Sequence, residues 1–324
     1  MSDGTDHTTE PKVRTVLGDI APGDLGVCDA HDHLFLRSPR LPGEELDDPA
    51  AARSELDSFA QAGGQAMVQW TPWGMGRRLP ALSALSRQTG VHLIAATGLH
   101  QAKQYEDGRF PQGVDELADL FVRELTDSPV RAGLIKVAGA FHRLDQHSRR
   151  TMAAAAAAHH ATGAPIGVHL EGGTAALETL QFLCADHGVP AHRVILGHLL
   201  RHPDTAVHLR AAQAGAYLAF DGPSRAHHAS DHRLLECVAA LADAGHADRV
   251  LIGGDTVVAS ARSSADGPGM RHLLEGIRPR IAQEIGGDVA HAIFVGNPAL
   301  AFATHWRTAA PQPPENRSTP AELG

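Results

Sequence analysis

Short apolar segments alternate regularly with longer amphipathic segments along this chain. Each apolar run has five or six residues and lacks a polar face, which is typical of a buried parallel strand. The runs lie at 27–31, 66–71, 92–97, 133–137, 166–170, 194–198, 216–221 and 250–254. Helix-like segments separate them, often ending at a glycine, at 49–62, 79–89, 114–126, 148–162, 175–187, 203–214 and 229–244. Eight strands with intervening helices predict an α/β fold, a (β/α)8 TIM barrel.

A doubly wound open sheet is the alternative fold for such an alternation. The chain has neither a GxGxxG nor a GxxxxGK[ST] motif after a predicted strand, which favours the barrel. No Pro/Gly/Ser-rich linker divides it, so a single domain is expected. We predict a flexible N-terminus at 1–12, the barrel at 13–306 and a disordered Pro-rich tail at 307–324.

Composition excludes several classes of function. With 28 Lys+Arg, 37 Asp+Glu and a net charge of −9, the chain has no dense basic run for binding nucleic acid. Its three cysteines are far apart, which excludes a disulfide framework and a CxxC metal site. It has no apolar signal segment and no run of about 20 apolar residues. We expect a cytoplasmic protein that acts on a small molecule and binds neither nucleic acid nor a membrane.

Histidine and aspartate recur at the C-terminal ends of the predicted strands, which form the functional face of a barrel. His31 and His33 point to the same side of an extended segment, and His169, His198 and Asp255 end three other strands. Singly, each has a structural explanation: a chance HxH pair, a core histidine or a helix-capping aspartate. Together they predict a site for zinc, or for manganese, iron or cobalt.

Lys136 interrupts the apolar run at 133–137, in a chain whose other lysines are only Lys12 and Lys103. Burial favours the neutral amine, which can react with carbon dioxide to form a carbamate. A carbamate is an anionic oxygen ligand that can bridge two metal ions. The structural alternative is a lysine paired with a carboxylate.

Several separated motifs resemble the phosphotriesterase family of the amidohydrolase superfamily. They occur in the same order, across about 13–302, at 15–18, 25–27, 31–33, 71–77, 95–99, 135–138, 220–222 and 297–298. The resemblance implies a homodimeric hydrolase with two divalent metal ions, for which zinc is expected.

The resemblance also assigns roles to the residues at the strand ends. It implies that His31, His33 and Asp255 hold the more buried metal. His169 and His198 would hold the more exposed one. Carboxylated Lys136 and a hydroxide would bridge the two metals, and Asp255 would accept the proton of the attacking hydroxide.

The chain departs from the phosphotriester-cleaving members of that family. Leu200 and Arg201 stand where those members have an Asp pair, and Gly222 stands where they have a histidine. Their proton relay is therefore in doubt here. The candidates to replace the missing relay residues are His202, His227 and His228. The alternative for each is a solvated loop histidine with no role in proton transfer. His100 replaces an expected aromatic residue.

These departures favour a carboxylic ester, lactone or amide as substrate. The alternatives are a phosphotriester or phosphoester hydrolase and a non-catalytic ligand-binding barrel. The principal candidates for substrate contact are Trp73, His100, Tyr105, Asp221 and Arg225, followed by Trp70, Arg77, Lys103 and Phe141. The alternative roles for Asp221 are to orient a pocket residue or to hydrogen-bond the loop backbone. Arg225 or Arg201 would clamp a carboxylate or phosphate, unless both are simply solvated.

Overall fold

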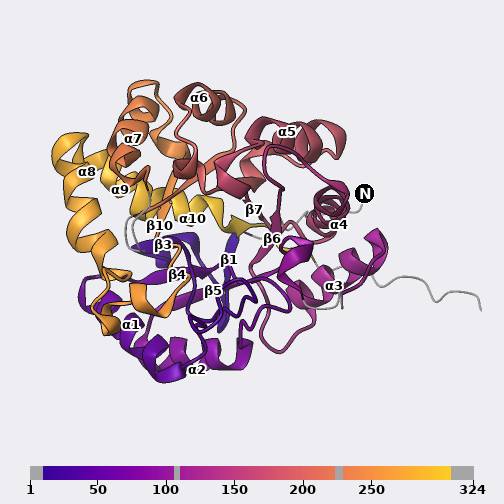
Figure 1. Cartoon of the computed structure of the whole chain (residues 1–324), viewed down its shortest axis with the longest axis horizontal. Helices are drawn as coiled ribbons and strands as arrows, with labels where there is room; N and C mark the ends of the chain where they lie inside the picture. The colour runs from indigo at the N-terminus through magenta and orange to yellow at the C-terminus, as the bar shows by residue number, and fades with distance from the viewer. Residues whose placement is uncertain (1–9, 106–109, 223–228, 308–324) are drawn as a thin grey trace, which may run out of the picture.

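A computed structural model describes residues 10–105, 110–222 and 229–307. Eight parallel strands stand side by side in chain order and form a nearly closed barrel, surrounded by helices (Figure 1). They are β3 (Cys28–Asp32), β4 (Ala66–Gln69), β5 (His92–Thr97), β6 (Leu134–Ala138), β7 (Ile166–His169), β8 (Val194–Gly197), β9 (Tyr217–Asp221) and β10 (Val250–Gly253). All eight predicted strands are present, and the predicted TIM barrel is confirmed.

The barrel closes where β10 approaches β3. The backbone N–H of Asp255, just after β10, donates to the carbonyl oxygen of His31 at 2.9 Å. A Cβ atom at Gly253 would collide with the backbone of His31, so this close approach requires glycine. This contact brings together His31, a predicted metal ligand in β3, and Asp255, a predicted metal ligand just after β10.

Ten α-helices lie within the described residues and cover the outside of the barrel. They are α1 (Pro49–Gln61), α2 (Leu79–Thr89), α3 (Val114–Thr126), α4 (Gln146–Thr162), α5 (Ala176–Leu180), α6 (Thr205–Gln213), α7 (Leu234–Asp243), α8 (Arg278–Glu284), α9 (Gly287–His291) and α10 (Asn297–Ala301). The side chains of Asp48, Asp145 and Asp204 cap the N-termini of α1, α4 and α6. Gly90 and Gly163 end α2 and α4 in the left-handed conformation, as their positions predicted.

Two apolar cores stabilise this arrangement. One lies between strands and helices and includes Phe59, Phe121 and Phe220. The other fills the barrel interior around Trp70, which is fully buried. Removal of such side chains from water is the main force that favours folding.

A small sheet that the sequence did not predict joins the two ends of the described chain. Strand β1 (Lys12–Thr15) pairs antiparallel with both β2 (Gly18–Ile20) and β11 (Ala303–Thr304). The backbone N–H of Val16 donates to Leu93 near the start of β5, so this sheet lies at the N-terminal ends of the barrel strands. Residues 1–12 were expected to be flexible and 307–324 to be disordered. Lys12 lies in β1, and residues 1–9 and 308–324 are outside the described part of the chain.

Two expectations from composition concern the described part of the chain. All three cysteines are free, as their spacing predicted. Within the described ranges, no helix is both long enough and apolar enough to span a bilayer.

Candidate metal centre

One cavity of about 150 Å³ at the C-terminal ends of the strands brings together all the predicted metal ligands. His31 lies in β3 and Lys136 in β6, and His169 is the last residue of β7. Three more ligands lie just after strands: His33 directly follows β3, His198 directly follows β8, and Asp255 comes two residues after β10. All six are at most 8% exposed.

The backbone is unusual at two of these positions. His198 has φ 65° and Asp255 has φ 51°, which is the left-handed region that residues with a Cβ rarely adopt. Such a conformation costs roughly 1–3 kcal/mol and persists only where the surrounding structure enforces it. The two turns therefore direct His198 and Asp255 into the cavity at a cost in stability.

His31, His33 and Asp255 form a compact group, as the sequence predicted. The Nε2 atoms of His31 and His33 lie 3.5 and 3.4 Å from the same oxygen, Oδ1 of Asp255. Two imidazoles and a carboxylate at this separation can share one metal ion.

A hydroxyl group fixes the orientation of the His33 ring. His33 Nδ1 lies 2.7 Å from Oγ1 of Thr71, and that hydroxyl donates its own hydrogen to the carbonyl oxygen of Phe35 at 2.6 Å. Oγ1 must therefore accept from Nδ1–H of His33. This arrangement leaves the lone pair of Nε2 free to bind a metal ion.

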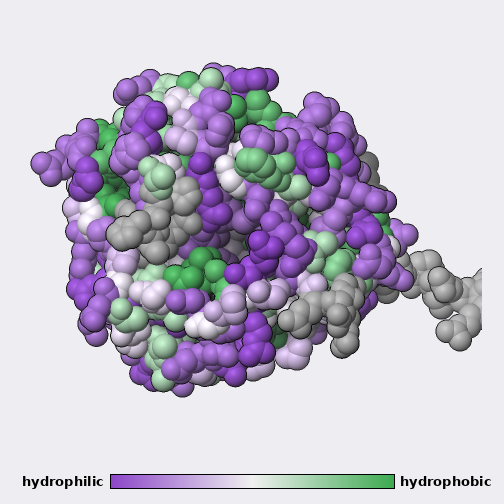
Figure 2. Space-filling model, viewed as in Figure 1, coloured by the Kyte–Doolittle hydropathy of each residue, from purple (hydrophilic) through white to green (hydrophobic). Residues whose placement is uncertain are grey.

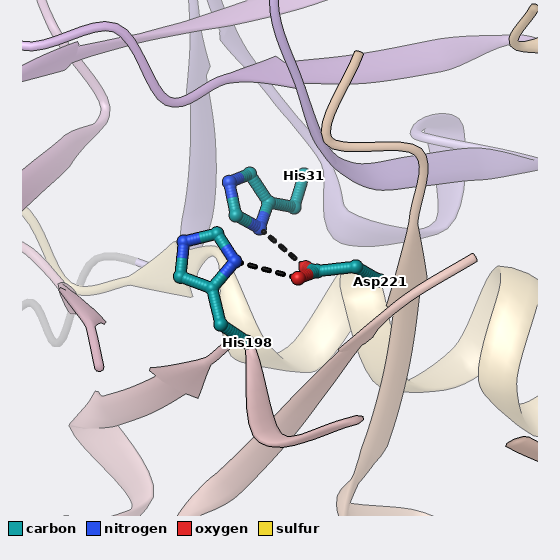
Figure 3. A group of neighbouring side chains, drawn as sticks. All are labelled: His31, His198 and Asp221. Carbon is teal, nitrogen blue, oxygen red and sulfur yellow. Dashed lines mark hydrogen bonds and ion pairs between the residues drawn. The ribbon is translucent and has the colours of Figure 1, made fainter. Parts of the chain in front are cut away.

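Asp221 contacts two of the predicted ligands (Figure 3). Its Oδ2 accepts from Nδ1 of His198 at 2.6 Å, and its Oδ1 lies 3.3 Å from Nδ1 of His31. Burial alone would raise the pKa of Asp221, but the adjacent His198 holds that pKa well below its usual range. Asp221 is fully buried and does not line the cavity, so it lies behind the two histidines and not beside a substrate.

His169 has its own carboxylate partner, Glu171. The Nε2 atom of His169 lies 2.9 Å from Oε2 of Glu171, and this contact lowers the pKa of Glu171 to about 2. The carboxylate is therefore an acceptor, Nε2 carries the proton, and the lone pair of Nδ1 remains available.

These contacts together fit the binding of divalent metal ions. Three of the four histidines, His33, His169 and His198, have one ring nitrogen hydrogen-bonded to an outer partner, as is typical of metal-binding histidines, and Nδ1 of His31 lies 3.3 Å from a carboxylate oxygen of Asp221. Burial lowers the pKa values of His33 and His169 to about 4, so these imidazoles are neutral, which is the ligand form. Burial also lowers the pKa of Lys136 to about 7.

Arg201 reaches the same cavity from the turn that follows His198. Its Nη2 donates to Oδ2 of Asp255 at 2.5 Å, and its Nε lies 3.5 Å from Oδ2 of Asp221. It is the one arginine among the described residues that line this cavity, and its side chain is 20% exposed. The position that departs from the phosphotriester-cleaving pattern thus places a cation beside Asp255.

The other candidates for substrate contact are distributed over two neighbouring cavities. His100 lines the metal-ligand cavity, whose apolar lining residues are Leu36, Leu41, Pro72, Met75 and Val257. Trp73 and Tyr105 line a second cavity of about 610 Å³. The two cavities share Ser38 and Gln104, whose side chains are hydrogen-bonded at 2.7 Å.

The remaining candidates lie elsewhere. Trp70 is buried in the barrel, Arg77 pairs with Glu124, and Lys103 pairs with Glu171. Phe141 is 59% exposed. The face of the molecule drawn in Figure 2 is mostly hydrophilic, with small apolar patches. His202 lines a third pocket beside α5. Three predicted residues are outside the described part of the chain: Arg225, His227 and His228.

Sequence reasoning missed two of the partners that hold the histidine rings, Glu171 and Thr71. Glu171 is only two residues beyond His169, and Thr71 follows β4 as the ligands follow their strands. A search for acceptors near each strand end would have found both. Their pairing with particular ring nitrogens depends on three-dimensional contacts that spacing does not reveal.

Comparison with known proteins agrees with this geometry. The model of the phosphotriesterase family matches residues 11–302. The N-acetyltaurine hydrolase of Tetraodon nigroviridis is 26% identical, over 89% of this chain and 96% of that protein. The phospho-furanose lactonase of Mycoplasmopsis synoviae is 29% identical, over 72% of each chain.

A solved structure is similar to this chain in both fold and sequence. The lactonase Lmo2620 from Listeria monocytogenes superposes with a TM-score of 0.84 and 27% identity, covering 90% of this chain and 98% of that one. The fold, the residues at the strand ends and the family match agree, and the chain is a hydrolase that belongs to the phosphotriesterase family.

Proposed function

We propose that this protein is a binuclear metal-dependent hydrolase that cleaves a carboxylic ester, a lactone or an amide. One observation carries the proposal. Four histidines line one cavity with Lys136 and Asp255; three of them have one ring nitrogen hydrogen-bonded to a protein partner, and the fourth, His31, has its Nδ1 3.3 Å from Asp221. A non-catalytic barrel has no need to maintain this arrangement.

The residues divide into two groups of metal ligands. His31, His33 and Asp255 would hold one ion, and His169 and His198 would hold the other, with zinc as the expected metal. Two divalent cations in this cavity would lower the pKa of a water molecule and polarise the substrate carbonyl. Lys136, buried in the same cavity, would carry a carbamate, which would supply an anionic oxygen ligand for the metal ions.

Other residues of the site position and move protons. Asp255 accepts the proton released when water attacks the carbonyl carbon. Asp221 orients His31 and His198 through their Nδ1 atoms. Arg201, which already donates to Asp255, would bind a carboxylate or phosphate carried by the substrate.

Three features support an acyl bond as the bond that is cleaved. The apolar side chains that line the cavity in the described part of the chain, Leu36, Leu41, Pro72, Met75 and Val257, include no aromatic residue, and an arginine replaces an acidic residue beside Asp255. Relatives named phospho-furanose lactonase and N-acetyltaurine hydrolase point the same way, because a lactone is an ester and an N-acetyl group is held by an amide. We propose His100, Trp73 and Tyr105, together with Arg225, as contacts for the remainder of a small-molecule substrate.

The test is hydrolysis of a panel of lactones, esters and amides beside an aryl phosphotriester, using protein loaded with zinc in the presence of bicarbonate. We expect acyl hydrolysis to exceed phosphotriester hydrolysis. The reverse order would identify a phosphotriesterase.

Metal analysis of the same preparation tests the binuclear centre. We expect two metal ions per chain. Fewer than one ion per chain after reconstitution would contradict a binuclear centre and favour a non-catalytic barrel. Sedimentation of the same sample tests whether the protein is the homodimer that we propose.

A further inference from the structure

Glu171 is the acceptor for three side chains at the rim of the cavity. Its Oε2 accepts from Nε2 of His169 at 2.9 Å and from Nε2 of Gln101 at 3.0 Å. Its Oε1 accepts from Nζ of Lys103 at 3.2 Å. Both carboxylate oxygens are therefore engaged with protein donors, which distinguishes Glu171 from a residue that offers an oxygen to a metal ion.

The contact with His169 determines which of its nitrogens can bind a metal. An imidazole whose Nε2–H donates to a carboxylate has its lone pair on Nδ1. His169 differs in this respect from His33 and His198, whose Nδ1 atoms are engaged and whose Nε2 atoms are available. Without an acceptor at Nε2, the His169 ring would lose both its tautomer preference and its orientation.

The same carboxylate connects three strand ends. Gln101, which follows β5, donates to Glu171 and also to the carbonyl oxygen of Gly139 at 2.7 Å. Gly139, which follows β6, donates its backbone N–H to the carbonyl oxygen of His169 at 2.9 Å. These hydrogen bonds span β6, the strand that carries Lys136, and fix His169 relative to it.

We propose that Glu171 is a positioning residue for metal binding: it holds Nε2–H of His169 so that Nδ1 faces the second metal, with Gln101 and Lys103 holding Glu171 in place. This inference rests on the proposed function, because it assumes that His169 is a ligand. Partners of this kind typically change metal affinity 10–100-fold when they are removed.

The contacts predict a graded response to substitution. Glu171→Ala removes the acceptor, and we expect the more weakly bound zinc to lose roughly 10–100-fold in affinity. Glu171→Gln retains an amide oxygen that can accept from Nε2–H, so a smaller loss is expected. Zinc affinity is measured by competition with a chromophoric chelator, for each of the two ions separately.

A second measurement does not depend on activity. Nitrogen-15 NMR of the zinc-free protein, with labelled histidine, reports which ring nitrogen of His169 carries the proton. We expect Nε2–H in the wild type and in Glu171→Gln, and a mixture of tautomers in Glu171→Ala. If Glu171 were merely structural, Glu171→Ala would lower the free energy of unfolding without changing the tautomer.

Glu178→Gln is the matched control. Glu178 lies in α5, shortly after Glu171, and pairs with Arg149 at 2.7 Å on the surface. We expect this variant to keep wild-type affinity for both zinc ions. Wild-type affinity in Glu171→Ala would overturn the inference, whereas a wild type that binds less than one zinc ion would contradict the proposed function itself.

Discussion

The indole ring of Trp70 stacks on the imidazole of His31, with ring centroids 4.0 Å apart and planes inclined by 24°. Trp70 is fully buried, and its Nε1 donates to the carbonyl oxygen of Ala30 at 2.8 Å. A Cβ atom on Gly167 of β7 would lie 2.9 Å from this indole. A residue of the barrel core thus supports a predicted metal ligand, and a glycine on a distant strand makes room for it.

Gly167→Ala tests this support. The added methyl group must displace the indole in a close-packed interior, so we expect the free energy of unfolding to fall by about 1–3 kcal/mol. Displacement of the indole should also weaken zinc binding. Denaturant unfolding and zinc titration measure the two effects. Gly287→Ala is the control, because its Cβ would contact nothing within 4 Å; equal stability of the two variants would show that the indole adapts freely.

Lys136→Ala tests the carbamate. The side chain is buried among the predicted ligands, so its removal should reduce the bound metal below two ions per chain and abolish most hydrolysis. A short carboxylic acid added to the buffer can occupy the vacated space, and it should restore part of the metal content and part of the hydrolysis. Metal content is measured by plasma emission spectroscopy. Unchanged metal content would refute a bridging role for Lys136.

Arg201→Gln tests the recognition of an anionic group. A charge-assisted hydrogen bond contributes about 1.5–3 kcal/mol, so kcat/KM for a carboxylate-bearing ester should fall roughly 10–100-fold. A neutral ester of matched size should be much less affected. Equal losses for both substrates would instead indicate that Arg201 acts through Asp255, to which it donates.

His159, far from the cavity, predicts a pH dependence of stability. Burial lowers its pKa to about 4, from an ordinary value near 6.5, and its Nδ1 donates to the carbonyl oxygen of Ala164 at 2.7 Å. The unfolded chain therefore binds a proton at a higher pH than the native protein does. The contribution of neutral His159 to the free energy of unfolding is complete above about pH 6.5. It is lost as the pH falls towards 4, and the loss amounts to up to about 3 kcal/mol.

His159→Asn removes this titration and keeps a donor for Ala164. The free energy of unfolding is measured in denaturant at pH 7 and at pH 4.5. From pH 7 to pH 4.5 we expect it to fall less for His159→Asn than for the wild type. The exposed neighbour His160 provides the control, and His160→Asn should show the wild-type dependence. Parallel curves for wild type and His159→Asn would contradict the prediction.

The barrel could be predicted because each of its parallel strands is an uninterrupted apolar run. The run at 92–97 matches β5 at both ends, and the other strands differ from prediction by one or two residues. The small sheet of β1, β2 and β11 could not be predicted, because β11 has only two residues and its pairing joins segments almost 300 residues apart. Local sequence pattern contains no information about such a contact.

The candidate site, like the fold, could be predicted in part: the residues at the strand ends, but not all of their hydrogen-bond partners. His31 and His33 were found because alternate residues of a strand share a side, and His169 and His198 because strand ends meet at one rim. Two partners of their rings, Thr71 and Glu171, were not found. For Asp221 the sequence left two roles open, substrate contact and orientation of a pocket residue, because a residue at the end of a strand can point into the cavity or behind its neighbours, and only the fold decides.

The pairing of β1 with β11 has a practical consequence for engineering. Lys12 lies opposite Thr304, so the two ends of the described chain meet at the pole of the barrel away from the cavity. A short peptide could join these ends, and a new start could be opened in a surface turn, to give a circular permutant with an unaltered metal centre. A reporter domain attached at either end would likewise leave the entrance to the cavity clear.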